Sequence, residues 1–411
     1  MTRYLHILSL ALVLTLLCTG TTFAQTEQPV YCQDVSAADC TLLMESQDAM
    51  STVASGTSQM DLSILLRDIP EAPFKEISLD YSQGTLFNAD TSVFEAIDEL
   101  KAMPPRQIQQ LVSNPQSLFG LIGTLIAGIS TDVDMTLDLS SELAMMLSQE
   151  SGMPLPENMA FHFVLADGAI YADLDSLAAF APDASTLQGW MGVELQPLLD
   201  EAAKGANTQL SSQDAAELSM ALGYVNTGAS GPFLVTLGAA DPTGQYLQFV
   251  NTERLANETV DGVEMAVFSS TFDYQTFFQS EVFRQLLKQI MEQQGAEVSD
   301  AELAQIGGMA QMFGPVLMTT LNLEVREWIG VKDHYLYDTS AVFNWDLSSI
   351  AALAAFGGDA MPIPQLPPGA KPYIGFEMTT HSSDLNGEVA VEVPESAVLI
   401  PTEVILQSAG Q

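Results

Sequence analysis

The chain contains 411 residues, of which 12 are basic and 52 are acidic, and its formal net charge is −40. Such a negative surface repels nucleic acid and anionic lipid headgroups, so neither is expected as a partner. Hydrophobic residues make up 47% of the chain. That fraction excludes a disordered protein, because so much apolar surface must be buried.

The first 24 residues have the pattern of a secretory signal peptide. Arg3 precedes an apolar run from Leu5 to Leu17, and the small residues Thr22 and Ala24 define a cleavage site after Ala24. The mature protein is therefore expected outside the cytoplasm, as a secreted, periplasmic or cell-surface protein. Cys18 does not indicate lipidation, because leucines stand where a small residue is required before the cysteine.

Residues 25–40 are expected to form an N-terminal leader with a cysteine pair. Cys32 and Cys40 are the cysteines of the mature chain, and export places them where disulfides persist. We expect a disulfide between them, with two free thiols as the alternative.

Residues 41–396 are expected to form a single domain, followed by a C-terminal tail over residues 397–411. Apolar and polar residues alternate, as in half-buried strands, at residues 60–64, 77–81 and 133–139. Helical patterns occur at residues 42–53, 94–100, 108–112, 198–203, 214–225, 282–291 and 303–313. These elements predict a mostly antiparallel sheet of roughly ten strands, with helices packed on one face.

Four turns connect the predicted strands. Asp167-Gly168 and Asp261-Gly262 lie between alternating runs, and such dipeptides favour type I′ hairpins because both central residues need positive φ. Asn386-Gly387 is expected to close a further hairpin, before a strand over residues 389–393. The fourth turn is Lys332-Asp333.

The hairpin over residues 321–346 is the longest of the predicted hairpins. Apolar residues fall on odd positions before Lys332-Asp333 and again after it. This parity indicates two long strands with one buried face, which requires a large apolar partner surface. Large apolar side chains also occur in the last predicted strand, at Phe376 and Met378.

The C-terminal half also resembles a known group of proteins. Residues 325–331, with Trp328-Ile329, resemble a "hydrophobic-x-x-Trp-Ile-Asp" hairpin in which Gly330 replaces the Asp. Residues 260–264 are similar to the "VxGVxx" turn of the same group, and residues 383–394 resemble its "SDxN…PxxVxxP" ending. Together these motifs, over residues 244–396, resemble the LolA/LppX/LprG-like superfamily of bacterial lipoprotein carriers.

The resemblance implies an α+β fold: a long curved antiparallel β-sheet, or half-barrel, with helices covering the concave face. It further implies a cavity between sheet and helices that holds acyl chains. The expected ligand-lining residues are Leu323, Val325, Tyr335, Tyr337, Phe343, Trp345, Phe376 and Met378.

The sequence shows no pattern of catalytic chemistry. His162, His334 and His381 are not part of a zinc-protease or nucleophile motif. Asp132-x-Asp134 lacks the spacing of a calcium loop, and paired carboxylates arise by chance in so acidic a chain. We therefore expect no enzyme activity, no cofactor and no metal.

Two functions fit these observations. The first is an exported binder or carrier of a lipid or other hydrophobic ligand, held in an apolar cavity between sheet and helices. A neutral lipid or glycolipid is favoured, because few basic residues are present to bind an anionic headgroup. Transient contact with a membrane or an envelope protein is compatible with this role. The alternative is a cell-surface or envelope interaction domain with a filled core and no ligand.

Overall fold

The computed structural model describes residues 32, 34–69, 72, 74–112, 114–152, 154–177, 189–205, 231–241, 243–293, 308, 320–348, 370–402 and 404. The predicted signal peptide with its cleavage site, and the predicted helix at 214–225, lie outside these residues, as does the predicted helix at 303–313 apart from residue 308. No helix within the described ranges is both long enough and apolar enough to cross a membrane.

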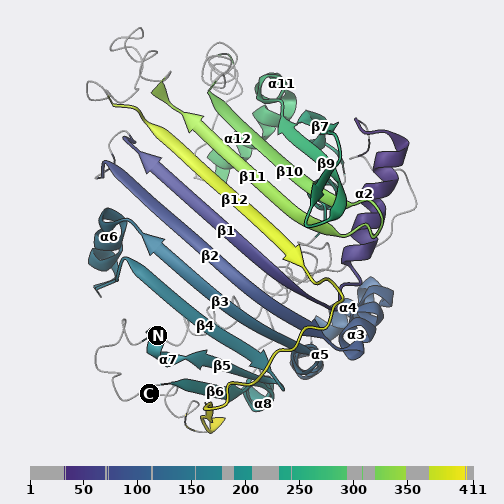
Figure 1. Ribbon diagram of the computed structural model, residues 1–411, viewed down its shortest axis with the longest axis vertical. Coiled ribbons are helices and arrows are strands. Elements are labelled where there is room, and N and C mark those ends of the chain that lie inside the picture. The colour runs from purple at the N-terminus through teal and green to yellow at the C-terminus, as the bar shows by residue number, and fades with distance from the viewer. Residues whose placement is uncertain are drawn as a thin grey trace.

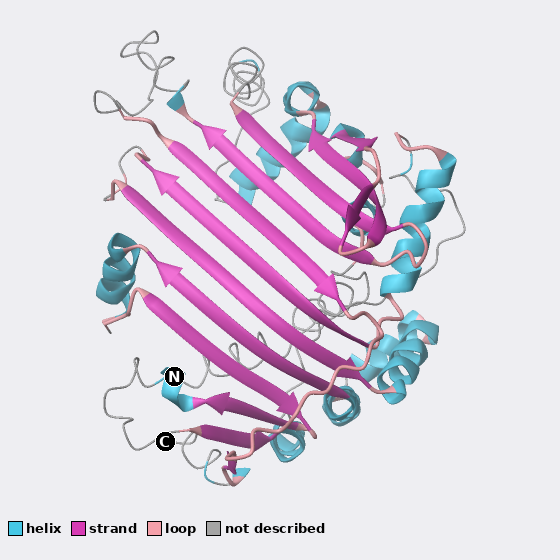
Figure 2. Cartoon of the chain, viewed as in Figure 1, coloured by secondary structure: helices cyan, strands magenta, loops and turns pink. Residues whose placement is uncertain are grey.

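One open sheet of 13 strands spans the molecule, and its long strands run diagonally across the views in Figures 1 and 2. The strand order is β13-β6-β5-β4-β3-β2-β1-β12-β11-β10-β9-β7, and β8 pairs with β9. Every described pairing is antiparallel except β6 with β13, which is parallel. The predicted α+β half-barrel is confirmed. Its strands are β1 Ser55–Arg67, β2 Glu76–Ala89, β3 Ile129–Leu139, β4 Asn158–Ala166, β5 Ala169–Asp173, β6 Trp190–Glu194, β7 Val250–Arg254, β8 Glu258–Val260, β9 Val263–Phe272, β10 Leu321–Gly330, β11 Leu336–Asp346, β12 Tyr373–Ser383 and β13 Val398–Leu399.

Helices occupy the connections between strands. Three of them link β2 to β3 and lie in the lower right of Figure 1, where α8 packs against α5. Capping side chains fix several starts: Ser36, Asn114 and Ser140 each accept a backbone N–H within the first turn. The helices are α2 Ala37–Met50, α3 Thr91–Ala102, α4 Pro105–Val112, α5 Pro115–Gly128, α6 Ser141–Ser151, α7 Leu174–Leu177, α8 Leu195–Gly205, α10 Phe233–Ala240, α11 Tyr274–Gln279 and α12 Glu281–Gln293, with the 3₁₀ helix η3 at Leu247–Phe249.

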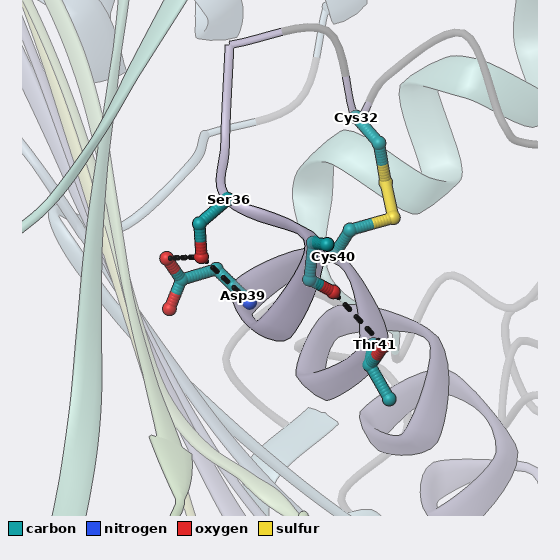
Figure 3. Close-up of a disulfide and its surroundings, with 6 residues drawn as sticks. Cys32, Ser36, Asp39, Cys40 and Thr41 are labelled. Atoms are coloured by element: carbon teal, nitrogen blue, oxygen red, sulfur yellow. Dashed lines mark hydrogen bonds between the residues drawn. A yellow bond between two sulfur atoms is a disulfide. The ribbon is translucent and has the colours of Figure 1, made fainter.

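The predicted disulfide is present. Cys32 is joined to Cys40, which lies in the first turn of α2 and is 6% exposed. Figure 3 shows the bridge beside the start of the helix, where Ser36 Oγ donates to Asp39 Oδ2 at 2.6 Å and Thr41 Oγ1 donates to the Ala37 carbonyl at 2.9 Å. The bridge therefore ties the chain before α2 to its first turn.

Three of the four predicted hairpins are confirmed. Asp167-Gly168 joins β4 to β5 and Asp261-Gly262 joins β8 to β9, with φ positive at all four residues. The third joins β10 to β11 through residues 331–335. The fourth prediction is wrong, because no strand follows Asn386-Gly387 at residues 389–393.

Asn386 instead hydrogen-bonds the end of β12 to the start of β1. Its N–H donates to the Ser55 carbonyl at 2.8 Å, and its Oδ1 accepts the Ala54 N–H at 2.6 Å. The following segment is the yellow chain in Figure 1 that crosses the ends of the strands between β12 and β6. The Asn-Gly dipeptide thus makes a turn, but the returning chain does not pair with β12.

The described core has two separate parts, at opposite ends of the sheet. In the first, called here the β9–β11 core, helices α2 and α10 pack on strands β9, β10 and β11. Its buried members are Leu43, Met50, Leu234, Leu247, Val250, Ala266, Phe268, Ile329 and Leu336. In the second, the β4–β5 core, Val164, Ala166, Ala169 and Tyr171 are covered by residues that include Trp190 and Val391.

Candidate functional site: the apolar face of the central sheet

The strand register divides the sheet into an apolar and a polar face. Residues directly opposite each other in an antiparallel pair point to the same side, so the register can be followed across the sheet. One such row contains Leu323, Phe343, Phe376, Ile64, Leu79 and Leu139, from β10 to β3. The next contains Val325, Ala341, Met378, Leu62, Tyr81, Leu137 and Met159, from β10 to β4.

The central strands carry these large side chains without burying them fully. In β1, β2 and β12 the fully buried residues are Ser55, Gly56 and Gly375, and none of them has a large side chain. Leu62, Phe376 and their row neighbours in these strands are half-buried. The middle of the apolar face is therefore less covered than the β9–β11 core.

A polar strip crosses one end of the same face. The row after Met378 contains Glu327, Thr339, Thr380, Met60 and Gln83. On β2, the Tyr81 hydroxyl donates to Gln83 Oε1 at 2.5 Å, and Gln83 Nε2 donates to Thr85 Oγ1 at 2.9 Å. Hydroxyl and amide groups thus border the apolar rows.

The structure brings six of the eight predicted lining residues onto these two rows or directly beside them. Leu323, Phe343 and Phe376 share the first row, Val325 and Met378 share the second, and Trp345 pairs with Leu321 one row further out. Val325 is 8% exposed, so it is already packed. Whether these residues line a ligand stays a prediction.

Tyr335 and Tyr337 lie apart from the other six, at the turn end of the hairpin. Tyr335 packs against the β9–β11 core, and its hydroxyl accepts a hydrogen bond from Asn386 Nδ2 at 2.9 Å. The Tyr337 hydroxyl donates to Asp333 Oδ2 at 2.7 Å. The expected single parity along β11 is wrong here, because the register shifts at Trp328/Ile329 and Leu336 pairs with Ile329.

Sequence reasoning overlooked Glu327, which has the parity of Val325 and Ile329. Its side chain is 1% exposed and accepts a hydrogen bond from the Phe233 N–H at the start of α10. Burial raises the pKa of Glu327 to about 7, although the bond from Phe233 acts in the opposite direction. A lone charged residue among odd apolar positions was the available signal.

The opposite face is polar and is hollowed over the middle strands. A cavity of about 280 Å³ lies over β12, β1, β2 and β3. Its lining is mostly acidic or hydroxylated: Asp61, Ser63, Asp80, Ser82, Thr136, Asp138, Glu377 and Thr379. These residues alternate with the apolar rows, so this hollow is not the predicted space between sheet and helices.

Comparison with known proteins returns structures but no sequence families. No family model and no curated protein matches the chain. The structure is similar to the crystal structure of the lipoprotein LppX from Mycobacterium tuberculosis, at 11% identity and a TM-score of 0.24, over 86% of this chain and 100% of that one. It is also similar to LprF from Mycobacterium bovis, at 10% identity and a TM-score of 0.27, over 90% and 99%.

A third similar structure is an outer membrane lipoprotein-sorting protein domain from Vibrio parahaemolyticus, at 7% identity and a TM-score of 0.15, over 90% of this chain and 96% of that one. LppX gives its name to the branch that the sequence motifs resemble.

Proposed function

We propose that the protein is an extracytoplasmic, non-catalytic binder or carrier of a lipid or another hydrophobic molecule. The observation that supports this proposal is the half-buried apolar face of β12, β1 and β2, which continues from the β9–β11 core. Half-buried apolar side chains that continue across several strands suit a protein in which a ligand or partner completes their burial.

The binding energy comes from the acyl portion of the ligand. Burial of each methylene contributes about 0.8 kcal/mol, so a long chain is retained without a charged anchor. The rows that contain Leu62 and Ile64 offer contact along several strands, which suits an extended chain.

The polar part of the ligand is uncharged in this proposal. The strip with Gln83, Thr85 and Thr380 offers amide and hydroxyl groups, which hydrogen-bond to sugars and glycerol without requiring a counter-charge. The net charge of −40 disfavours an anionic headgroup. A neutral lipid or glycolipid, with its head near Gln83 and its tail over the apolar rows, matches both features.

A matched pair of neighbouring residues tests the proposal. Leu62 and Ser63 are consecutive in β1 and point to opposite faces. Leu62→Trp should fill space over the apolar rows and weaken binding of a fluorescent acyl probe to delipidated mature protein at least tenfold. Ser63→Trp adds the same bulk on the polar face and should leave the affinity within twofold.

Two results would overturn the carrier proposal. If delipidated wild-type protein does not bind the probe, the alternative of an interaction domain with a filled core takes its place. If Leu62→Trp binds as well as the wild type, the apolar face is not the site. Native mass spectrometry of the purified protein gives an independent check, because a carrier retains lipid through purification.

A further inference from the structure

A compact group of three metal-binding side chains lies on the polar face, away from the proposed lipid site. Asp132 and Asp134 are two residues apart in β3, so they point to the same side, and His162 lies directly opposite Asp134 in β4. Potential ligand atoms of all three lie within 4.8 Å of one another. Within the described parts of the chain, this is the group of three such residues that converges.

The histidine ring is placed between the two carboxylates. His162 Nε2 lies 2.6 Å from Asp132 Oδ1, and His162 Nδ1 lies 3.3 Å from Asp134 Oδ1. The ring of Trp190 packs edge-on against the imidazole, with ring centroids 4.6 Å apart and an interplanar angle of 77°. Side chains from β3 and β6 therefore hold the ring of this β4 residue in its orientation.

This arrangement suits a cation. A neutral imidazole carries one N–H, so it can donate to only one of two carboxylates and leaves the other facing a lone pair. A metal ion on one ring nitrogen, with the N–H on the other, removes this conflict. The surrounding field favours a divalent ion, because Asp138, Asp80 and Asp61 lie on the same face in the neighbouring rows.

There is also space for a metal and its water ligands. Gly84 in β2 lies directly opposite Asp134, and an added Cβ there would find nothing within 4 Å. The side chain of Asp134 is 70% exposed, so the site opens to solvent on this side. Water can therefore complete a coordination sphere that has three protein ligands.

We propose that Asp132, Asp134 and His162 bind a divalent transition metal that accepts mixed nitrogen and oxygen ligands, such as Zn²⁺ or Mn²⁺. His162 Nε2 and one oxygen of each carboxylate bind the ion, for which the exposed Asp134 side chain turns from Nδ1 toward Nε2. Because the ligands come from β3 and β4, the ion cross-links two strands and stabilises the folded protein. The site is independent of lipid binding on the opposite face.

The same face supplies a matched control. His381 Nδ1 lies 2.6 Å from Asp338 Oδ1, on the register row that also contains Gly84 and Asp134. This second histidine–aspartate pair has the same short contact, but no third ligand converges with it among the described residues. It thus distinguishes a three-ligand site from a simple ion pair in an acidic surface.

The test uses EDTA-stripped mature protein titrated by calorimetry with Zn²⁺ alone and with Mn²⁺ alone. We expect saturable 1:1 binding of at least one of these metals and a rise in Tm on addition of that metal. Asp134→Asn and His162→Gln should each weaken this affinity at least tenfold and abolish the Tm shift. His381→Gln should leave both within twofold of the wild type.

Other results would overturn the metal site. If neither metal binds with 1:1 stoichiometry, the three side chains form a hydrogen-bonded cluster without a metal. If Asp134→Asn and His162→Gln bind like the wild type, or if His381→Gln loses as much affinity, the ions bind the acidic surface without a specific site. Circular dichroism of each variant without metal confirms that the fold is intact.

Discussion

The carboxyl group of Glu327 in β10 accepts a hydrogen bond from the backbone N–H of Phe233, the first residue of α10. The N-cap residue of this helix is Pro232, which makes no side-chain cap bond. A residue of the sheet therefore performs the capping role that a local Ser or Asp usually performs. The contact joins the helix to the sheet beside the β9–β11 core.

Stability should depend on the ionisation of Glu327. Its pKa of about 7 lies above the ordinary value of 4.5, so the folded protein holds this proton more tightly than the unfolded chain does. The free energy of unfolding should therefore fall as the pH rises from about 4.5 to about 7, by about 3 kcal/mol. Denaturant unfolding at pH 5 and pH 8 measures this loss.

Glu327→Gln should remove this pH dependence of the free energy of unfolding, because glutamine stays neutral and still accepts the Phe233 N–H. Glu324→Gln is the control, since a hydrogen bond from Arg326 holds the pKa of Glu324 below its ordinary value and this carboxyl is already charged at pH 5. An unchanged slope in Glu327→Gln would contradict the assignment.

Acid should destabilise the protein through Asp241. Burial alone would raise the pKa of this carboxyl, but hydrogen bonds from Tyr246, Leu247, Thr243 and Gln245 lower it below 3.8 overall. A lowered pKa contributes stability that is present above the ordinary value and is lost as the pH falls through the folded value. The free energy of unfolding should therefore fall less below pH 4 in Asp241→Asn than in the wild type.

At neutral pH, Asp241→Asn should cost about 2–3 kcal/mol, because its amide group replaces an oxygen that accepts backbone N–H groups. Thr243→Ala removes one neutral donor, 3.0 Å from Asp241 Oδ1, and should cost about 1 kcal/mol. Equal losses in the two variants would show that the backbone bonds to Asp241 contribute little.

Removal of the disulfide should destabilise α2 and the core that it covers. The loop between Cys32 and Cys40 is short, and the chain-entropy model gives a contribution of about 2.5 kcal/mol for such a loop. Cys32→Ser and reduced wild-type protein should lose the same amount in denaturant unfolding, because Cys40 keeps its packing in both. A loss confined to the reduced wild type would indicate that another effect of the reductant is responsible.

Asn386 should show two separable contributions to stability. It has a φ of 57°, and its side chain bonds Ala54 and Tyr335. Asn386→Gly permits this backbone conformation and loses only the side-chain bonds, so it should cost about 1–2 kcal/mol. Asn386→Ala adds backbone strain, for a further loss of about 1 kcal/mol. Tyr335→Phe should add little in the Asn386→Gly background, which a double-mutant cycle measures.

The strands and most turns could be predicted from sequence because they depend on local rules. Alternation at Leu62 and Leu79 identifies the buried parity, and the Asp-Gly turns need positive φ at fixed positions. The Asn386-Gly387 turn obeys the same rule, but whether a strand pairs afterwards is decided by distant residues. Ser55 and Ala54 hold this turn from the other end of the sequence.

The site was predictable only in part, for two physical reasons. A single shift of register near Trp328 moved Tyr337 away from the other expected lining residues, and sequence periodicity gives no sign of such a shift. The convergence of His162 with Asp132 and Asp134 depends on the pairing of β3 with β4. The sequence contains all three residues but does not show that they lie close together in space.

The position of β12 has a consequence for how the chain reaches its native state. Strands β1 to β6 follow one another on one side of the sheet, and β7 to β11 are gathered on the other, so each half can assemble from nearby segments. The sheet becomes continuous when β12 enters between β1 and β11, with Met378 opposite Leu62. Pairing so distant in sequence is slow to form. Until it does, β1 and β11 present long unpaired edges to other chains, and this interval is when aggregation competes with folding.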